Sequence, residues 1–450
     1  MRKPWRPRLN PSKAMPPESR RDWPVDPGAP AGWRRTYSSL QIPGYRWLWL
    51  GMLAYFMAMQ MDTVARGYLA YDLTGSATAL GVVTIAWGLP MLLLSLVGGA
   101  VADRVEKRNL LLFAQVAMAL VALTTALLVQ TGLVQIWHLV MLGVAQGATW
   151  SFIVPARQAL VPELVGEDEL ANALALNNGA INVTRIAGPS TAGALIAVPL
   201  VGLPGVFYLM VFLYALVVLT LLRVPTTGRA AGREVGPILQ EIGIGVRYVT
   251  GRSALMVLLG LAFVAVLLGM PYNILLPVFA EDVHQVGSVG LGLMSTFVGM
   301  GAILGSLVIA YFSNYPGRAT LQIVLGMGFG MGLFLFGGAP IFVLALAALS
   351  LMGFMVAGYM TLNNTLIFIH AERRFHGRVM SVYMLTWSLM PLSALPMAAL
   401  ADVVGAQAVM AAAGLLVFVV IASVGIFYPG YRELGATATS SVPAEGRDGP

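Results

Sequence analysis

The sequence predicts an all-α integral membrane protein with twelve transmembrane helices, arranged as two six-helix halves that are pseudo-repeats of each other. Three observations lead to this fold class. The chain of 450 residues is 58% hydrophobic and only 10% charged, which is typical of proteins that span a bilayer. Apolar runs of roughly 20 residues, the length that crosses about 30 Å of hydrocarbon, recur along it. A long connection at about 224–253 separates six of these runs from the other six.

Each predicted span begins and ends where turn residues or charges interrupt an apolar run. The first half, residues 44–223, contains spans at 46–70, 78–101, 110–130, 134–156, 172–198 and 203–223. The second half, residues 254–428, contains spans at 254–280, 288–312, 319–338, 341–368, 379–400 and 404–428. Each range is approximate because span ends are the least certain part of such an assignment.

The segments outside the two halves are predicted to lie in the cytoplasm. Residues 1–43 are rich in proline and arginine, and neither they nor residues 429–450 contain an apolar core, so both are predicted to be disordered tails. The linker, residues 224–253, is expected to contain a short amphipathic surface helix because apolar residues recur along it. These residues are Ile238, Ile242, Ile244, Val246 and Val249.

Basic residues predict how the chain is oriented in the membrane. They fall in alternate loops and in the N-terminal tail, whereas the loops between them carry acids. The basic residues are Arg104, Lys107, Arg108, Arg157, Arg223, Arg229, Arg233, Arg247, Arg252, Arg318, Arg373, Arg374 and Arg378, and the acids are Asp72, Glu281, Asp282 and Asp402. Because lysine and arginine near span ends stay on the cytoplasmic side, we expect a bacterial inner-membrane protein with both termini in the cytoplasm.

The composition also excludes several chemistries. The chain has no cysteine, so thiol chemistry and thiolate metal sites are impossible. None of the lysines lies in a Gly-Lys-Ser/Thr phosphate-binding context. The histidines lie at span ends or in loops, without the neighbouring acids of a metal site. The net charge of +7 comes from arginines beside spans and indicates a bilayer surface, not nucleic acid. The sequence therefore predicts no cofactor, no metal and no enzymatic activity.

The densest charge lies in the hairpin between the second and third spans, residues 98–108, which read GGAVADRVEKR. This string resembles the hairpin signature of the major facilitator superfamily. The resemblance implies that family's twelve-helix fold and transport by alternating access, with Asp103 helping to hold one access state. Glycines allow two helices to approach closely and the arginines anchor at headgroups. The predicted gating motif consists of Gly99, Asp103, Arg104, Lys107 and Arg108.

Other strings resemble a narrower branch of that superfamily, the macrolide-efflux and enterobactin-exporter-like proteins. They are PARQALVPEL at 155–164, LANA at 170–173, RIAGP at 185–189 and GRVMS at 377–381. This resemblance implies export. Two positions depart from superfamily patterns: Gly143 stands where a membrane arginine is common, and Gly188-Pro189 with Gly193 lacks the full glycine spacing of the antiporter signature.

Charged groups inside a span are the first candidates for a transport site, because each costs at least about 2.5 kcal/mol in hydrocarbon. The first span carries Gln60, Asp62 and Arg66, and the last two, four residues apart, share one helical face. We predict that Asp62 is the proton-coupling group, with an occupancy that alternates with access and is biased by Arg66 or Arg185. The alternative is an ion pair in a wet cavity, with Asp62 permanently charged.

A second polar face is predicted on the fifth span, where Asn178, Asn182 and Arg185 share one side of the helix. Prolines in the seventh and eleventh spans are expected to kink those helices. The remaining candidates for the cavity are aromatic or polar residues in other spans. They are Trp150, Tyr272, Asn273, Tyr359 and Trp387.

These features predict a monomeric secondary active transporter that exports an amphiphilic small molecule, such as a drug or a siderophore, in exchange for protons. The predicted cavity charge of about +1 favours neutral or anionic cargo. Import of a metabolite, or flipping of a lysophospholipid, is an alternative within the same fold. A membrane enzyme or a non-transporting sensor is the alternative of another class, which the absence of a catalytic cluster and of a folded soluble domain disfavours.

Overall fold

The computed structural model describes residues 37–226, 238–311, 317–372, 375–428 and 430–433, and every regular element in these ranges is helical. The first elements are the 3-10 turn η1 (Ser38–Gln41) and the helices α2 (Pro43–Thr74), α3 (Ala77–Arg104), α4 (Lys107–Gln130), α5 (Ile136–Ile196), α6 (Gly202–Leu222) and α7 (Ile238–Thr250). They are followed by α8 (Ser253–Val264), α9 (Tyr272–Val278), α10 (Gly287–Tyr311), α11 (Arg318–Gly337), α12 (Phe342–His370), α13 (His376–Ser388), α14 (Met390–Val404), α15 (Ala406–Phe427) and α16 (Gly430–Glu433).

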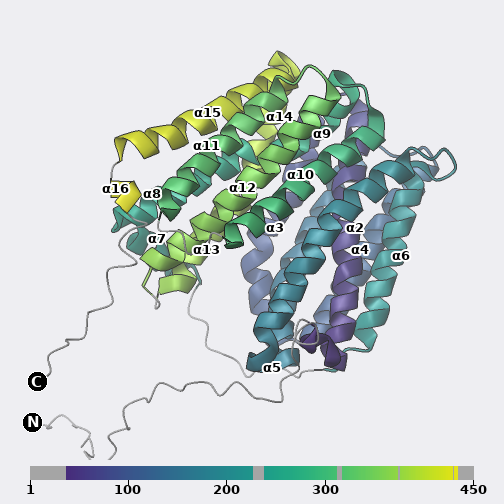
Figure 1. Ribbon diagram of the computed structural model, residues 1–450. Helices are drawn as coiled ribbons and strands as arrows, with labels where there is room; N and C mark the ends of the chain where they lie inside the picture. The colour runs from purple at the N-terminus through teal and green to yellow at the C-terminus, as the bar shows by residue number, and fades with distance from the viewer. Residues whose placement is uncertain (1–36, 227–237, 312–316, 373–374, 429, 434–450) are drawn as a thin grey trace, which may run out of the picture.

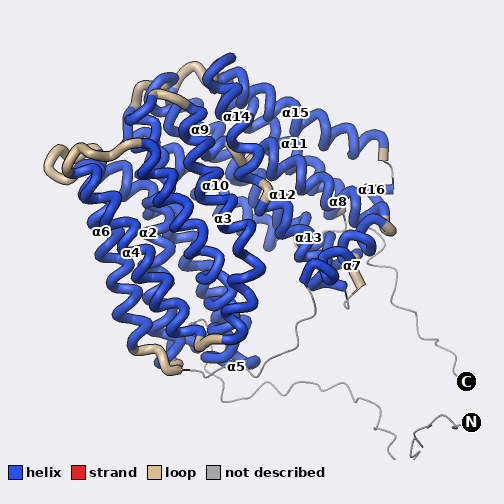
Figure 2. Tube along the Cα trace, turned by 180° about the vertical axis from the view of Figure 1, so that it is seen from behind, coloured by secondary structure: helices blue, strands red, loops and turns tan. Residues whose placement is uncertain are grey.

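The long helices pack in two groups, which lie beside each other in Figures 1 and 2. Helices α2 to α6 contact one another and form the amino-terminal bundle, while α8 to α15 form the carboxy-terminal bundle through contacts such as α10 with α12 and α11 with α15. The bundles meet mainly where α5 packs on α10 and where α3 packs on α14.

Ten helices of the described chain are long and apolar enough to cross a membrane. The expected twelve spans differ from these ten at two places. Helix α2, with 32 residues, carries Asp62 and Arg66 near its middle and is not among the ten. Helix α5 counts once although it has 61 residues and would be about 92 Å long if it were straight.

Helix α5 is in fact broken at Gly166, whose φ of 73° and ψ of 179° are not helical. A positive φ of this size is a conformation that glycine adopts without strain. The residues between the expected fourth and fifth spans are helical on both sides of this break. The sequence reading placed Arg157 in a loop after the fourth span, and this is wrong: Arg157 lies inside α5, which also accommodates Pro155 and Pro162.

The expected kinks are present in both proline-containing segments. Between α8 and α9 the helix widens into the π-helical turn η2 (Ala265–Gly269), and a second π turn, η3 (Phe279–Val283), follows α9. Helices α13 and α14 are separated at Leu389, shortly before Pro391. Proline removes a backbone donor and displaces the preceding turn, so each segment can bend at a fixed place.

Glycines bring several helix backbones into direct contact. A Cβ at Gly147 of α5 would overlap the carbonyl oxygen of Trp87 in α3, and one at Gly353 of α12 would overlap that of Val298 in α10. Without a hydrophobic force between helices in lipid, such close approach is a main source of packing energy. The sequence could show the glycines but not which helix each one contacts.

Two segments outside the long helices are docked onto them. Residues 38–41, which the sequence reading assigned to a disordered tail, form η1, because the Ser38 and Ser39 hydroxyls donate to the Glu169 carboxylate at 2.6 and 2.9 Å. The expected linker helix is present as α7, packed against α13, with the ring of Tyr248 stacked on Phe375 at 3.9 Å. Residues 1–36 and 312–316, and most of the C-terminal tail, lie outside the described residues.

Candidate functional site

The predicted coupling residue lies in a buried polar cluster between α2 and α5. Asp62 is 7% exposed and Arg66 is 8% exposed, and their side chains pair at 3.0 Å between Oδ1 and Nη2. The second carboxylate oxygen accepts a 2.8 Å hydrogen bond from Nε2 of Gln146, which is 6% exposed. Within the part of the chain that the structure describes, Asp62 is the one acidic side chain that is buried. This pairing favours Arg66 over Arg185 as the partner of Asp62.

The cluster leaves hydrogen-bonding capacity unused. Nη1 of Arg66 and Oε1 of Gln146 are buried and have no partner among the described residues. Buried polar groups are ordinarily satisfied, and an orphaned one marks a binding or catalytic role or a bound water. A ligand or water that accepted from Arg66 and donated to Gln146 would complete the cluster. The sequence reading missed Gln146.

Asn178, Asn182 and Arg185 form a polar row on α5 after the break at Gly166. Arg185, at one end of this row, contacts the other bundle. Gly299 of α10 lies against the aliphatic stem of Arg185, where a Cβ would be 3.2 Å from its Cγ. Arg185 and Asn182 are half-buried, whereas Asn178 is exposed. Since these three residues share one helical face, the row runs from the contact between the bundles to an open surface. Gln60 of α2 is half-buried and packs on Gly188 of α5, close to this row.

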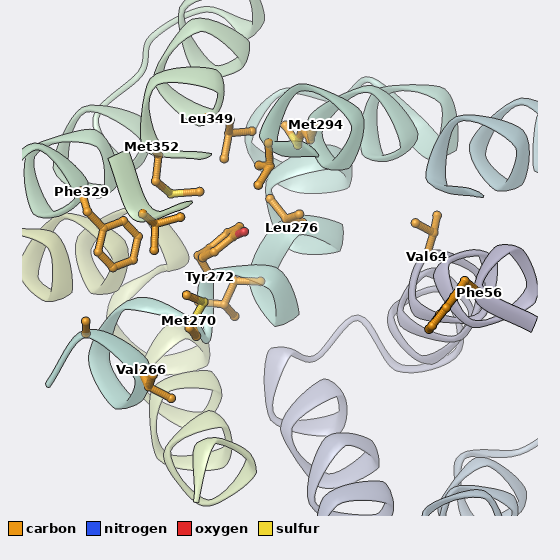
Figure 3. Packing of buried hydrophobic residues seen from close by; sticks show 14 of the residues in the cluster. Phe56, Val64, Val266, Met270, Tyr272, Leu276, Met294, Phe329, Leu349 and Met352 are labelled. Atoms are coloured by element: carbon orange, nitrogen blue, oxygen red, sulfur yellow. The ribbon is translucent and has the colours of Figure 1, made fainter. Parts of the chain in front are cut away.

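The aromatic candidates are distributed over both bundles. The ring centroid of Trp150 lies 5.6 Å from that of Trp87 in the amino-terminal bundle. Tyr272 is buried among Met270, Leu276 and Met352 (Figure 3).

Three further candidates lie in the carboxy-terminal bundle. Asn273 is exposed and its Nδ2 is 3.5 Å from the carbonyl oxygen of Met270. Tyr359 is fully buried inside the bundle and packs against Gly326. Trp387 is half-buried at the end of α13. Among the candidates, Arg185 contacts the other bundle directly, through Gly299 of α10.

A buried hydrogen-bond chain in the carboxy-terminal bundle was not expected from the sequence. The Tyr431 hydroxyl donates to Oε1 of Gln322 at 2.6 Å, and Nε2 of Gln322 donates to Oδ1 of Asn363 at 2.7 Å. Burial raises the pKa of Tyr431, so its hydroxyl remains a donor at neutral pH. These two hydrogen bonds tie α16 to α11 and α12. Single polar residues in apolar runs were its only signal in the sequence.

The charged hairpin is anchored to the amino-terminal bundle by part of its motif. Lys107 is 1% exposed and its Nζ lies 2.8 Å from Oε1 of Glu163. Arg108 donates to the carbonyl oxygens of Leu221 and Leu222 at the end of α6, at 2.9 and 2.8 Å. These contacts fix the hairpin to α5 and α6.

The other members of the motif stay at the surface. Asp103 and Arg104 are exposed, and neither makes a hydrogen bond or ion pair with a described residue. A Cβ at Gly99 would meet no atom within 4 Å. The exposed side chains of Asp103 and Arg104 can therefore contact another part of the protein.

The opposite end of the molecule is closed by contacts between the bundles. The Asp402 carboxylate of α14 accepts from the Ala77 and Thr78 backbone N–H groups at 2.7 and 2.8 Å, and from the Ser76 and Thr78 hydroxyls at 2.7 and 2.6 Å. Ser76 is the N-cap residue of α3 but provides no cap through its own side chain. A carboxylate from the other bundle therefore caps α3.

Two more contacts join the bundles near this end. The Tyr71 hydroxyl donates to the Asp282 carboxylate, and the hydroxyls of Ser190 and Thr296 lie 2.6 Å apart. In the described chain, no hydrogen bond joins the bundles at the hairpin end. The structure is thus held closed at the end that carries Asp282 and Asp402.

Replacing Asp402 by alanine is expected to weaken this closure. Loss of a helix cap costs about 1 kcal/mol, so the population that is open at this end should rise about fivefold. The chain has no cysteine, so spin labels on Leu200→Cys and Val343→Cys, exposed residues of the two bundles, can report the separation. The matched control is Asp72→Ala, an exposed acid of α2, which should leave the distance distribution unchanged. If the distance distribution of the Asp402 variant were unchanged, the cap on α3 would not be one of the contacts that keep this end closed.

Comparison with known proteins places this architecture in a family. Residues 34–444 match the family model described as transmembrane secretion effector. The staphyloferrin A transporter of Staphylococcus aureus is 26% identical, over 73% of this chain and 82% of the relative. The multidrug efflux pump Tap of Mycolicibacterium fortuitum is 27% identical, over 82% of this chain and 92% of the relative. The macrolide efflux protein A of Streptococcus pyogenes is 21% identical over the same shares.

The fold itself is similar to that of solved transporters. The crystal structure of the nucleoside transporter NupG superimposes with a TM-score of 0.69 at 12% identity, covering 85% of this chain and 98% of that one. A bacterial homologue of the iron transporter ferroportin in an inward-facing state gives 0.65 at 18% identity, with 85% and 98% covered. The matches to efflux proteins confirm the resemblance stated from the hairpin and the four branch-specific strings.

Proposed function

The chain belongs to the major facilitator superfamily, in the family of transmembrane secretion effectors, and on this premise we propose that it exports an amphiphilic small molecule in exchange for protons. The observation that carries the proposal is the buried cluster of Asp62, Arg66 and Gln146. A buried carboxylate that can be neutral or charged is the group a proton-coupled transporter needs. Relatives described as efflux pumps support export over import.

The coupling step follows from the contacts of the cluster. When Asp62 is charged, the ion pair holds the Arg66 guanidinium against α2, and both groups are compensated. The charged carboxylate can also accept a hydrogen bond from a hydroxyl or amide group of the cargo, whereas the protonated carboxyl group attracts such a donor less. Proton binding and cargo binding then compete for Asp62, which is the relation that exchange requires.

The twelve-span arrangement is also part of this proposal. The ten membrane-length helices become twelve when α2 is included and α5 is divided at Gly166. A membrane helix that contains a paired Asp62 and Arg66 is tolerated because both side chains face the bundle interior. The two bundles then have six spans each, with both termini on one side, and together act as a monomer.

The basic hairpin supports placing the termini in the cytoplasm of a bacterial cell. On that orientation, the end closed by Asp402 and Asp282 is the outer end, and the structure is the inward-facing state. Residues 98–108 then face the cytoplasm, with Asp103 and Arg104 exposed. In the outward-facing state these two residues are expected to contact the other bundle.

The polar residues between the bundles favour a neutral or anionic cargo. Arg66 and Arg185 exceed Asp62 by one charge, and Tyr272 adds an apolar surface with a hydroxyl group. Amphiphilic molecules such as siderophores and macrolides combine an apolar body with acceptor groups of this kind. The names of relatives, which transport staphyloferrin A or expel macrolides, agree with this class.

The direct test is counterflow and gradient-driven flux in proteoliposomes with a panel of siderophores, macrolides and cationic dyes. We expect exchange of an amphiphilic anion or neutral molecule, accelerated when the cargo-receiving compartment is acidic, because protons then move opposite to the cargo. Acceleration only when protons and cargo move the same way would replace exchange by symport. Exchange of lysophospholipid alone would indicate a flippase.

Replacing Arg185 by alanine should weaken cargo binding about tenfold, since a charge-assisted hydrogen bond contributes about 1.5–3 kcal/mol. The measurement is the concentration of cargo that gives half-maximal counterflow. The matched control is Arg223→Ala, because Arg223 is an exposed arginine stacked on Trp47 at 4.4 Å, outside the site. An unchanged half-maximal concentration would give Arg185 a packing role only.

A further inference from the structure

Arg157 is a charged residue that the proposed transport cycle does not use. Its guanidinium carbon lies 4.7 Å from the ring centroid of Phe56 and 5.4 Å from that of Tyr55. No acid of the described chain pairs with it, and its Nη1 is buried without a hydrogen-bond partner. Arg157 is half-buried, and cation–π contacts compensate only part of the cost of removing a charge from water. The interior therefore lacks a counter-charge at this point.

Two more orphaned polar atoms belong to the neighbours of Arg157. The hydroxyl oxygen of Tyr55 and Oε1 of Gln115 are both buried without a partner, and each residue is 2% exposed. Tyr55, Gln115 and Arg157 all line one cavity of about 20 Å³. It lies between α2, α4, α5 and α6, and its other walls are apolar. A cavity needs about 10–15 Å³ of space that a water-sized sphere can occupy in order to hold one water molecule or an ion of similar size.

We propose that this cavity binds a single small inorganic anion of about the size of chloride. Arg157 supplies the positive charge and an N–H donor, the Tyr55 hydroxyl supplies a second donor, and Gln115 supplies a third when its amide group turns by 180°. The volume excludes carboxylates and phosphates of ordinary metabolites. A water molecule would satisfy hydrogen bonds but leave the guanidinium charge uncompensated.

The site is one helical turn from the anchor of the charged hairpin. Leu221 lines the cavity, and its carbonyl oxygen accepts the hydrogen bond from Arg108. Leu111, near the start of α4, lines it as well. An anion held here would stabilise the end of the amino-terminal bundle from which the hairpin projects, without contacting Asp62.

The first measurement is the thermal stability of the purified full-length protein in sodium chloride and in sodium gluconate at equal ionic strength. A ligand of the folded state raises the melting temperature, and above the dissociation constant the rise grows with the logarithm of the ligand concentration, so we expect a rise of several degrees with chloride. Arg157→Gln should abolish the rise, and Tyr55→Phe, which keeps the ring, should increase about tenfold the chloride concentration needed for the same rise. The matched control is Arg223→Gln, whose arginine also stacks on an aromatic ring but is exposed, and it should respond as the original protein does.

The second measurement locates the anion directly. Crystals grown with bromide in place of chloride should show an anomalous signal between Tyr55, Gln115 and Arg157. Equal melting temperatures in chloride and gluconate, or a cavity without bromide signal, would show that the site holds water or nothing and would overturn the proposal. If Arg157→Gln does not fold, Tyr55→Phe and the bromide signal still decide the question.

Discussion

Asp62→Asn is expected to abolish export driven by a pH gradient, with a loss of at least tenfold, while exchange of cargo across the membrane in the absence of a gradient continues. Asparagine has nearly the shape of aspartate and can still accept from Gln146, but it cannot take up and release a proton. The flux of cargo in proteoliposomes, with and without an imposed gradient, measures both quantities. Gradient-driven flux that survives the substitution would exclude Asp62 as the coupling group.

The single variant leaves Arg66 as a buried charge without its partner, and breaking a buried pair in this way costs about 3–5 kcal/mol. The double variant Asp62→Asn with Arg66→Gln removes both charges and should restore folding but not coupling. Asp72→Asn is the matched control, because Asp72 is an exposed acid in the same helix. A double variant that recovers coupled transport would show that the ion pair has only a structural role.

Gly193→Leu is expected to hold open the end of the molecule that carries Asp282 and Asp402, and to reduce transport by at least tenfold. At Gly193 the backbones of α5 and α10 touch: a Cβ would lie 2.5 Å from the carbonyl oxygen of Ser288 and 3.0 Å from the Cα of Gly292. Backbone atoms cannot move aside as a flexible side chain can, so the two helices must separate. Spin labels at positions 200 and 343 should then report a longer distance than in the original protein.

The control for this substitution lies in the same helix. Gly179 is exposed, and a Cβ there would meet no atom within 4 Å, so Gly179→Leu should leave the labelled distance unchanged. A similar lengthening in both variants would mean that a leucine anywhere on α5 disturbs the helix. An unchanged short distance in Gly193→Leu would show that α5 and α10 can adjust without opening this end of the molecule.

Several features could be predicted because they depend on residues close together in the chain. The 3.6-residue period places Asp62 and Arg66 on one face of α2, and the structure confirms that they pair. The expected amphipathic linker helix and the breaks near Pro271 and Pro391 are also local features. The reading failed at Arg157 because a charge beside prolines is typical of a loop, while two aromatic rings of α2 stabilise it inside the bundle.

The sequence by itself determined that the chain is a set of long apolar helices with few internal charges, since hydropathy and helical period are properties of neighbouring residues. Only the tertiary structure decided that Gln146 completes the cluster of Asp62, 84 residues away, and that Asp402 caps α3 from 326 residues away. Such pairs depend on which helices pack together and at what height they cross. Packing between helices is set by close approach at glycines such as Gly147 and Gly193, whose partners no local pattern names.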